Sequence, residues 1–280
     1  MVHVDLGAPG GSHGDLMTFA APVTSTELNG VHRGMIVTAA IPEPGSSPFQ
    51  DRIVKSVFSF GPSASLTMFG RSPYAIDSQG LDEVPVDQPI IKPIVGGTGD
   101  FVGTRGQVIT VRLEDGSYTQ ELQLVGTPQP ETATDVTIVI DQALPFITDI
   151  DIGVAGGSHG DVLAFDAEVT SSSGLLGNLS GLVTTVSLPS PNEPSFKNRI
   201  ANMVFDFGEG NTVVVMGISS YPFNGSHISE FEVKVPQTRS IVGGTGDYSA
   251  AQGQVTTVRN DDGSYQHTLL FTGDWLPNTP

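Results

Sequence analysis

Each half of this sequence carries an aspartate directly after a Gly-Gly-Thr-Gly stretch, at Asp100 and at Asp247. A carboxyl group enclosed among apolar side chains stays protonated more readily than one in water. It can then act as a general acid or donate a hydrogen bond to a carbonyl oxygen. The neighbouring glycines permit positive φ angles and close approach of the backbone. A chemical role and a structural role, in which Asp100 caps the glycine turn, are both open.

The glycine stretch also marks an internal duplication. Residues 94–101 (Ile-Val-Gly-Gly-Thr-Gly-Asp-Phe) recur as residues 241–248, which are 147 positions later. Two copies indicate duplicated domains rather than a solenoid, which usually needs three or more repeats. Other blocks recur at nearly the same offset, namely residues 10–15 as 156–161, 49–53 as 196–200, and 115–118 as 262–265.

Comparison of the two repeats separates shared arginines from unshared ones. Arg52 and Arg112 recur as Arg199 and Arg259, which indicates a scaffold role common to both repeats. An unshared arginine could instead donate to a carbonyl, enolate or carboxylate oxygen of a substrate. We therefore hypothesise that the first repeat holds the active pocket, the alternative being surface drift. Three arginines of the first repeat are absent from the second, namely Arg33 (Ser180 in the second repeat), Arg71 (Ile218) and Arg105 (Gln252).

Aromatic side chains could complete such a pocket. Tyr74 and Tyr221 are repeat partners whose phenol hydroxyls could donate hydrogen bonds at a barrel mouth, although half-buried packing is the commoner role. Phe19 and Phe69 are expected mainly in the core, where some aromatic rings must line any apolar pocket.

Two histidines, His13 and His159, lie in identical Gly-Ser-His-Gly-Asp loops and raise the question of a metal. A metal site needs three or more convergent ligands, and no third ligand stands at a defined spacing. The glycine loops also lack the helix pattern and the Lys-Ser/Thr pair of a phosphate-binding loop. We therefore predict no metal site.

Composition limits the partners. The chain has 280 residues, enough for two domains, and its formal charge of −18 predicts repulsion from nucleic acid and from anionic membranes. It has no cysteine, which excludes disulfides, thiolate nucleophiles and cysteine-ligated zinc. The first residues do not form a signal peptide, and no apolar run of about 18 residues could span a bilayer. We expect a cytoplasmic protein with no nucleic-acid or membrane partner.

Alternating apolar and polar residues, bounded by glycine and proline turns, predict an all-β fold. Eight antiparallel strands per repeat would leave no open edge if they closed into a barrel. Such a barrel has room for side chains or one small ligand. The strands expected in the first repeat are residues 3–6, 16–24, 31–41, 52–60, 65–71, 90–95, 105–113 and 117–125.

A joint separates the repeats. We expect a first barrel over residues 1–126, a linker over 127–148, and a second barrel over 149–280. Within the linker, residues 135–141 (Asp-Val-Thr-Ile-Val-Ile-Asp) predict a further strand that could pack one half on the other.

The order of these motifs resembles the plant dirigent proteins, which share a superfamily with the allene oxide cyclases. The similar residues are Gly-Asp-Leu-Met-Thr-Phe at 14–19 with Pro-Val-Thr at 22–24, the Gly-Gly-Thr-Gly-Asp-Phe block with its Arg-Gly at 96–106, and His-Val-Asp-Leu at 3–6. The resemblance covers nearly all of both repeats. It implies two tandem eight-stranded antiparallel calycin-like barrels that bind small apolar, oxygenated substrates without a cofactor.

The resemblance also implies site residues. Asp5 matches the family's first-strand aspartate, Asp100 its aspartate after the glycines, and Arg105 its Ala-Arg-Gly arginine. These three are the implied catalytic residues. The expected substrate-binding residues are Arg33, Arg71, Tyr74, Phe19, Phe69, Asp151, Asp247 and Tyr221.

Members of this superfamily steer radical coupling or ring closure, and bacterial relatives include [4+2] cyclases. Plant dirigent proteins match one repeat only and carry a disulfide, whereas this chain is doubled and has no cysteine. We therefore expect a cofactor-independent cyclase or isomerase that closes a ring in a polyketide or other secondary metabolite, by [4+2] cycloaddition or oxa-cyclisation. The rival expectations are a non-catalytic carrier of a hydrophobic metabolite and a structural module. A homo-oligomer is open.

Overall fold

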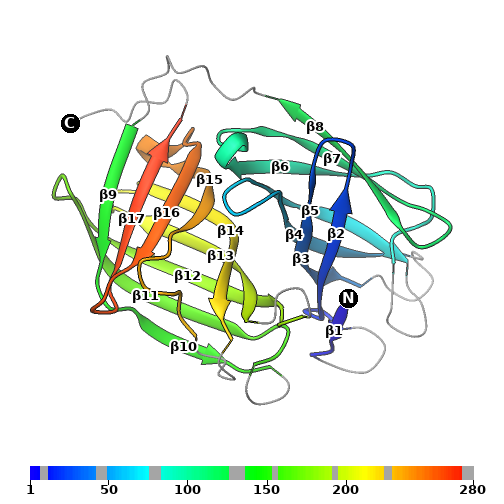
Figure 1. Cartoon of the computed structure of the whole chain (residues 1–280), viewed down its shortest axis with the longest axis horizontal. Coiled ribbons are helices and arrows are strands. Elements are labelled where there is room, and N and C mark those ends of the chain that lie inside the picture. The colour runs from blue at the N-terminus through cyan, green and yellow to red at the C-terminus, as the bar shows by residue number, and fades with distance from the viewer. Residues whose placement is uncertain are drawn as a thin grey trace.

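The computed structural model describes residues 1–6, 12–41, 49–75, 83–125, 136–152, 157–190, 195–223 and 229–272. Within these ranges the chain is all-β, apart from two short 3-10 helices, η1 (Gly99–Phe101) and η2 (Gly246–Tyr248). The strands form two antiparallel sheets that lie side by side as two lobes (Figure 1). The predicted all-β class is confirmed.

The first sheet contains eight strands, each hydrogen-bonded to the next in chain order. In the described residues its outermost strands, β1 and β8, do not pair, so the sheet is open. The expected closure of the first repeat into a barrel is therefore not confirmed. The strands are β1 (Val2–Val4), β2 (Leu16–Thr24), β3 (Asn29–Ala40), β4 (Phe49–Ser59), β5 (Ser65–Ala75), β6 (Ile90–Thr98), β7 (Arg105–Arg112) and β8 (Tyr118–Val125).

The second sheet closes into an eight-stranded antiparallel barrel. The closing strand β9 pairs with β17 on one side and with β11 on the other, and β10 pairs with the remaining part of β11. The strands are β9 (Val136–Gln142), β10 (Phe146–Ile150), β11 (Val162–Ser171), β12 (Leu176–Ser187), β13 (Phe196–Asp206), β14 (Thr212–Pro222), β15 (Gln237–Thr245), β16 (Gly253–Arg259) and β17 (Tyr265–Phe271).

The closing strand corrects the expectation for the linker. Residues 127–148 contain β9 and the start of β10, and both strands belong to the second sheet. The strand expected over 135–141 does not pack one half on the other, because its hydrogen bonds go to β17 and β11 of the second sheet. The first part of the linker, residues 127–134, lies outside the described residues.

Closure changes how the core is packed. In the second barrel one apolar cluster runs through the interior and includes Ile140, Leu179 and Phe205. In the first sheet the buried apolar residues fall into two separate clusters, one containing Val54 and the other Phe58. The closed barrel is therefore the better-enclosed of the two interiors.

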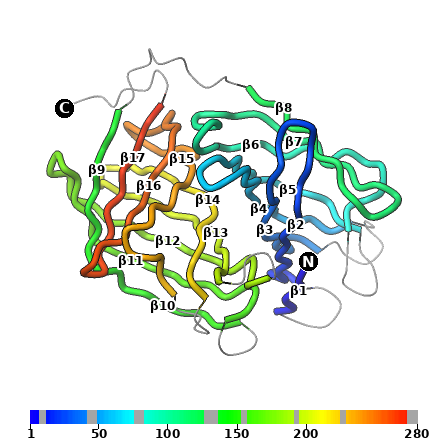
Figure 2. The backbone as a smooth tube through the Cα atoms, viewed as in Figure 1, coloured from blue at the N-terminus to red at the C-terminus, as the bar shows by residue number. Residues whose placement is uncertain are grey.

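The two repeats meet through their outer faces. Strands β2, β3 and β6 of the first sheet contact β12, β15 and β16 of the second, where the two lobes adjoin in Figure 2. The Thr18 hydroxyl lies 2.8 Å from Nδ1 of His159, and the hydroxyls of Thr67 and Ser240 lie 3.1 Å apart. An apolar cluster joins the two sheets through Leu16, Met35, Val186 and Ile200.

The Gly-Gly-Thr-Gly-Asp stretches build the two 3-10 turns. Gly99 and Gly246 have φ angles of 58° and 59°, a conformation that residues with a side chain rarely adopt. A side chain at Gly97 would collide with the backbone of Phe101. Asp100 itself is exposed to solvent. Turn geometry therefore explains why the glycines recur in both repeats.

Aspartates clamp the two Gly-Ser-His-Gly-Asp loops. Asp161 is buried and accepts hydrogen bonds from the backbone N–H groups of Ile152 (3.0 Å) and Ser158 (2.5 Å). Asp15 makes the corresponding pair of bonds in the first repeat, at 3.0 and 2.5 Å. These loops are thus held by a carboxylate. Among the described residues, no group of three or more histidine, aspartate or glutamate side chains could hold a metal.

Replacing Asp161 by asparagine is expected to lower the free energy of unfolding by about 1–2 kcal/mol. The amide keeps one acceptor oxygen, so one of the two hydrogen bonds is lost and the other loses the charge that strengthens it. Urea unfolding measures the change, and Asp15→Asn should give a similar loss. Asp151→Asn is the control, because Asp151 is exposed and surface substitutions usually change stability by less than about 0.5 kcal/mol. An unchanged unfolding midpoint for Asp161→Asn would contradict the clamp.

Candidate functional site

A cavity lies inside the second barrel. Its volume is about 70 Å³, several times the roughly 10–15 Å³ that one water molecule needs. It can therefore hold a small group of heavy atoms. The sequence-based hypothesis placed the active pocket in the first repeat, whereas this cavity is in the second. Its walls are formed by Gln142, Pro145, Ile147, Leu163, Phe165, Val183, Met203, Tyr221, Ser229, Glu230, Phe231, Arg239, Thr257, Tyr265 and His267.

A directed chain of hydrogen bonds crosses one wall of the cavity. Nη1 of Arg239 donates to the Thr257 hydroxyl at 3.1 Å. Nδ1 of His267 lies 3.0 Å from the same hydroxyl, and Nε2 lies 2.7 Å from Oε1 of Gln142. A carbonyl oxygen can only accept, so Nε2 of His267 carries the hydrogen and Nδ1 accepts from Thr257. The order Arg239 to Thr257 to His267 to Gln142 follows.

Burial keeps the imidazole in this chain neutral. Desolvation, with a smaller contribution from the charge of Arg239, lowers the pKa of His267 to about 3. Both ring nitrogens are already engaged, and the rings of His267 and Phe205 lie nearly perpendicular with centroids 5.2 Å apart. His267 therefore positions its neighbours and does not serve as a proton acceptor at neutral pH.

The first repeat contains a version of the same chain. Nζ of Lys92 donates to the Thr110 hydroxyl at 3.1 Å, and that hydroxyl donates to Oε1 of Gln120 at 2.7 Å. These residues are the 147-offset partners of Arg239, Thr257 and His267. Burial lowers the pKa of Lys92 to about 8. Both repeats therefore contain a hydrogen-bonded chain from a basic residue through a threonine, but only the chain of the second repeat combines an arginine with a histidine.

Tyr221 lies between two guanidinium groups at the cavity. The centre of the Arg199 guanidinium is 4.7 Å from the Tyr221 ring centroid, and the positive charge of Arg239 also acts on the Tyr221 hydroxyl. Burial raises the pKa of Tyr221, and both arginines offset part of that rise. The phenol is therefore neutral at pH 7, and a negative charge developing on its oxygen would be stabilised by two cations.

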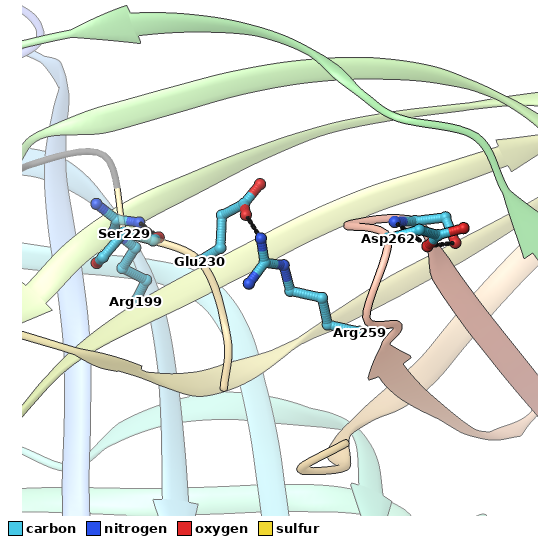
Figure 3. Close-up of polar contacts among 6 residues, drawn as sticks. Arg199, Ser229, Glu230, Arg259 and Asp262 are labelled. Carbon is cyan, nitrogen blue, oxygen red and sulfur yellow. Dashed lines mark hydrogen bonds and ion pairs between the residues drawn. The ribbon is translucent and has the colours of Figure 1, made fainter. Parts of the chain in front are cut away.

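The cavity mouth carries a carboxylate. Glu230 forms an ion pair with Arg259, drawn as a dashed line in Figure 3, and its negative charge adds to burial in raising the pKa of Tyr265. Nη1 of Arg199 donates to the backbone carbonyl of Ser229 at 3.0 Å, which fixes the residue before Glu230. Outside this segment lies an open cleft of about 410 Å³ that shares Ser229, Glu230 and Phe231 with the cavity wall. Residues 229–231, called here the Glu230 segment, therefore separate an inner cavity from an outer cleft.

Three of the sequence-predicted site residues, all aromatic, lie on the inner face of one of the two sheets. Tyr221 lines the cavity. Tyr74, its repeat partner, is buried against Arg52 at 4.8 Å in the first sheet. Phe19 packs edge-on against His32, at the position that corresponds to the cavity-lining Phe165.

The other predicted residues do not line this cavity. Arg71 is exposed and pairs with Asp51 at 2.5 Å, Phe69 is exposed beneath Lys55, and Arg33 is buried in β3. The exposed predicted aspartates are Asp5, Asp100, Asp151 and Asp247.

Arg105 lies between the repeats. It is half-buried, and its Nη1 is 3.5 Å from the Thr104 carbonyl oxygen. The same guanidinium lies beside Gly96, where Ser240 of β15 also packs. The structure thus does not bring Asp5, Asp100 and Arg105 together around the described cavity.

Sequence reasoning missed Glu230, Arg239 and His267. It searched for arginines of the first repeat that the second repeat lacks, whereas Arg239 is an arginine of the second repeat whose partner in the first is Lys92. The sequence did contain a signal for these positions, because both repeats keep a charged residue there: Glu83 and Lys92 stand 147 positions before Glu230 and Arg239. Arg199 was assigned to the scaffold, yet it also contacts Tyr221 at the cavity.

Comparison with known proteins leaves the family open. No family model and no curated protein matches the chain. A solved structure named pyocyanin demethylase is similar at 16% sequence identity, with a TM-score of 0.38, over 50% of this chain and 100% of that one. A likeness this weak assigns neither family nor function. In the described part of the chain, no helix is long and apolar enough to cross a membrane.

Proposed function

We propose that the cavity of the second barrel binds the oxygen-bearing end of a small apolar molecule. In this proposal the protein is a cofactor-independent isomerase or cyclase that acts by proton transfer. The observation that carries the proposal is the buried Tyr221 phenol held between Arg199 and Arg239 at an apolar cavity. The resemblance to the dirigent and allene oxide cyclase barrels forms part of the same proposal and agrees with it.

Two groups at the cavity suit enolisation of a carbonyl compound. The Glu230 carboxylate accepts a proton from the carbon next to the carbonyl, and the C–H electron pair moves to form an enolate. The Tyr221 hydroxyl donates to the enolate oxygen, and the nearby guanidinium groups stabilise negative charge there. Return of the proton to a different carbon gives an isomer. Attack of the enolate carbon on a C=O or activated C=C carbon of the same molecule closes a ring. The π electron pair of that double bond moves to its other end, which takes up the proton from Glu230.

The two volumes suit a substrate with a small head and a larger remainder. The inner cavity of about 70 Å³ accommodates only the reacting end, whereas the outer cleft of about 410 Å³ can take the rest. A polyketide-sized molecule would occupy both and pass the Glu230 segment. Polar groups beside the reacting end favour ionic ring closure over a [4+2] cycloaddition, which needs mainly a fixed conformer.

A carrier remains the second candidate, and one observation favours it. The charged groups at the mouth neutralise each other, since Glu230 forms an ion pair with Arg259. A ligand could then bind mainly through apolar contacts and leave unchanged.

Deuterium exchange in D₂O tests the proposal. Small enolisable ketones are incubated with the protein, and loss of the α-proton signal is followed by NMR. We expect catalysed exchange by the wild type and a fall of roughly 10²–10⁴ in Glu230→Gln, the usual effect of removing a general base. Glu83→Gln is the matched control, because Glu83 pairs with Arg112 in the first repeat as Glu230 does with Arg259. Ketone uptake without exchange would favour the carrier.

A further inference from the structure

The outer edge of β8 has no strand partner in the described part of the chain. Its repeat counterpart, β17, is covered on that side by β9 over seven residue pairs. The second barrel therefore provides an internal template for what the corresponding place in the first sheet can accept. That place, between β8 and the end of β2, is called here the β8 groove.

Exposure of apolar side chains shows the difference. Tyr118 and Leu124 of β8 are 39% and 43% exposed, whereas their counterparts Tyr265 and Phe271 in β17 are 9% and 1% exposed. Val125, at the end of β8, is 69% exposed. Inward-facing positions that β9 covers in the second barrel are thus left open to water in the first sheet.

We propose that the β8 groove binds an extended peptide strand of another protein, with aliphatic side chains at alternate positions. The pattern comes from β9, where Ile140, Ile138 and Val136 lie opposite His267, Leu269 and Phe271. The 147-residue offset places the same three positions of an incoming strand opposite Gln120, Leu122 and Leu124. Added strands of this kind gain affinity from backbone hydrogen bonds and specificity from alternate side chains.

The acidic charge on β8 favours basic residues on the outward face of the incoming strand. Thr268 lies opposite Val139 of β9, and the counterpart of Thr268 in the first sheet is the exposed Glu121. A lysine or arginine at the Val139 position of an incoming strand would therefore face a carboxylate. A second copy of this chain carries a formal charge of −18 and would be repelled, so a basic partner strand is the better fit.

The groove is anchored mainly on one side. β9 pairs with β11 over only three residues, whereas it pairs with β17 over seven. Most of the backbone hydrogen bonds to an incoming strand must then come from β8.

A synthetic peptide tests this inference independently of any activity of the cavity. The probe is a fluorescein-labelled peptide with the sequence of residues 136–142 carrying the change Val139→Lys. We expect saturable binding by fluorescence anisotropy, and no binding of a peptide with the same residues shuffled to remove the alternation. Hydrogen exchange should slow in β8 and stay unchanged in β14.

Two variants of the full chain locate the contact. Leu124→Glu should weaken peptide binding at least roughly tenfold, because it places a charge in the apolar groove. Ile91→Glu is the matched control, since Ile91 is 57% exposed on β6 of the same sheet, and it should bind as the wild type does. Absence of binding, or binding insensitive to Leu124→Glu, overturns the proposal. A dimer in light scattering that Leu124→Glu dissociates would also overturn it, because the occupant would then be a second copy.

Discussion

Tyr221→Phe is expected to lower the turnover number by roughly 10²–10³ while leaving the affinity for substrate nearly unchanged. This is the usual effect of removing one preorganised donor to a developing oxyanion. The phenylalanine keeps the ring that packs against Arg199 and Phe231, so the cavity retains its shape. The rate of α-deuteration measures the change with any ketone that the wild type exchanges.

Tyr74→Phe is the matched control for this substitution. Tyr74 is buried against Arg52 in the first sheet with nearly the same geometry, 4.8 Å compared with 4.7 Å. It should change the unfolding midpoint about as much as Tyr221→Phe does, and turnover not at all. Equal loss of turnover in both variants would remove the second barrel from its proposed role.

His267→Gln is expected to remove a large part of the acid sensitivity of the fold. Burial lowers the pKa of His267 from its ordinary 6.5 to about 3 in the folded chain, so between these values the unfolded chain binds more protons. Stability due to this group is therefore fully present above pH 6.5 and declines as the pH falls toward 3. At pH 4 the loss for one such histidine is about 3 kcal/mol.

Urea unfolding of the two proteins at pH 7 and pH 4 measures this difference. The glutamine variant should lose about 3 kcal/mol less than the wild type over this range. Gln120 already occupies the equivalent position in the first repeat and accepts from Thr110, which indicates that glutamine fits there. His13→Gln provides the control, because His13 is exposed, and it should leave the acid limb unchanged. Parallel acid limbs for wild type and His267→Gln would contradict the assignment.

The strands were predictable because their signal is local. Alternation and turn residues located β2, β4, β7 and β8 to within a few residues of their observed bounds. The partner of β9 was not predictable in this way. Its apolar alternation was visible, but Gln142 meets His267 across 125 residues, and nothing near β9 in the sequence specifies that pairing.

The site was harder to predict because burial, not residue type, decides which groups reach the cavity. Asp100 and Arg239 are both charged and both stand in duplicated segments. One is exposed on a 3-10 turn, whereas the other is 1% exposed inside the barrel. The exposure of Asp100 follows from the turn that Gly99 makes, and the burial of Arg239 follows from closure of the barrel by β9.

The position of β9 in the chain also sets the order in which the protein can fold during synthesis. β9 leaves the ribosome before every other strand of its sheet, and its partner β17 is the last of them. At about 5–20 residues per second, the 125 residues between Gln142 and His267 take roughly 6–25 s to make. The second barrel cannot close during that interval. The first sheet has no such wait, because each of its strands pairs with the one made just before it.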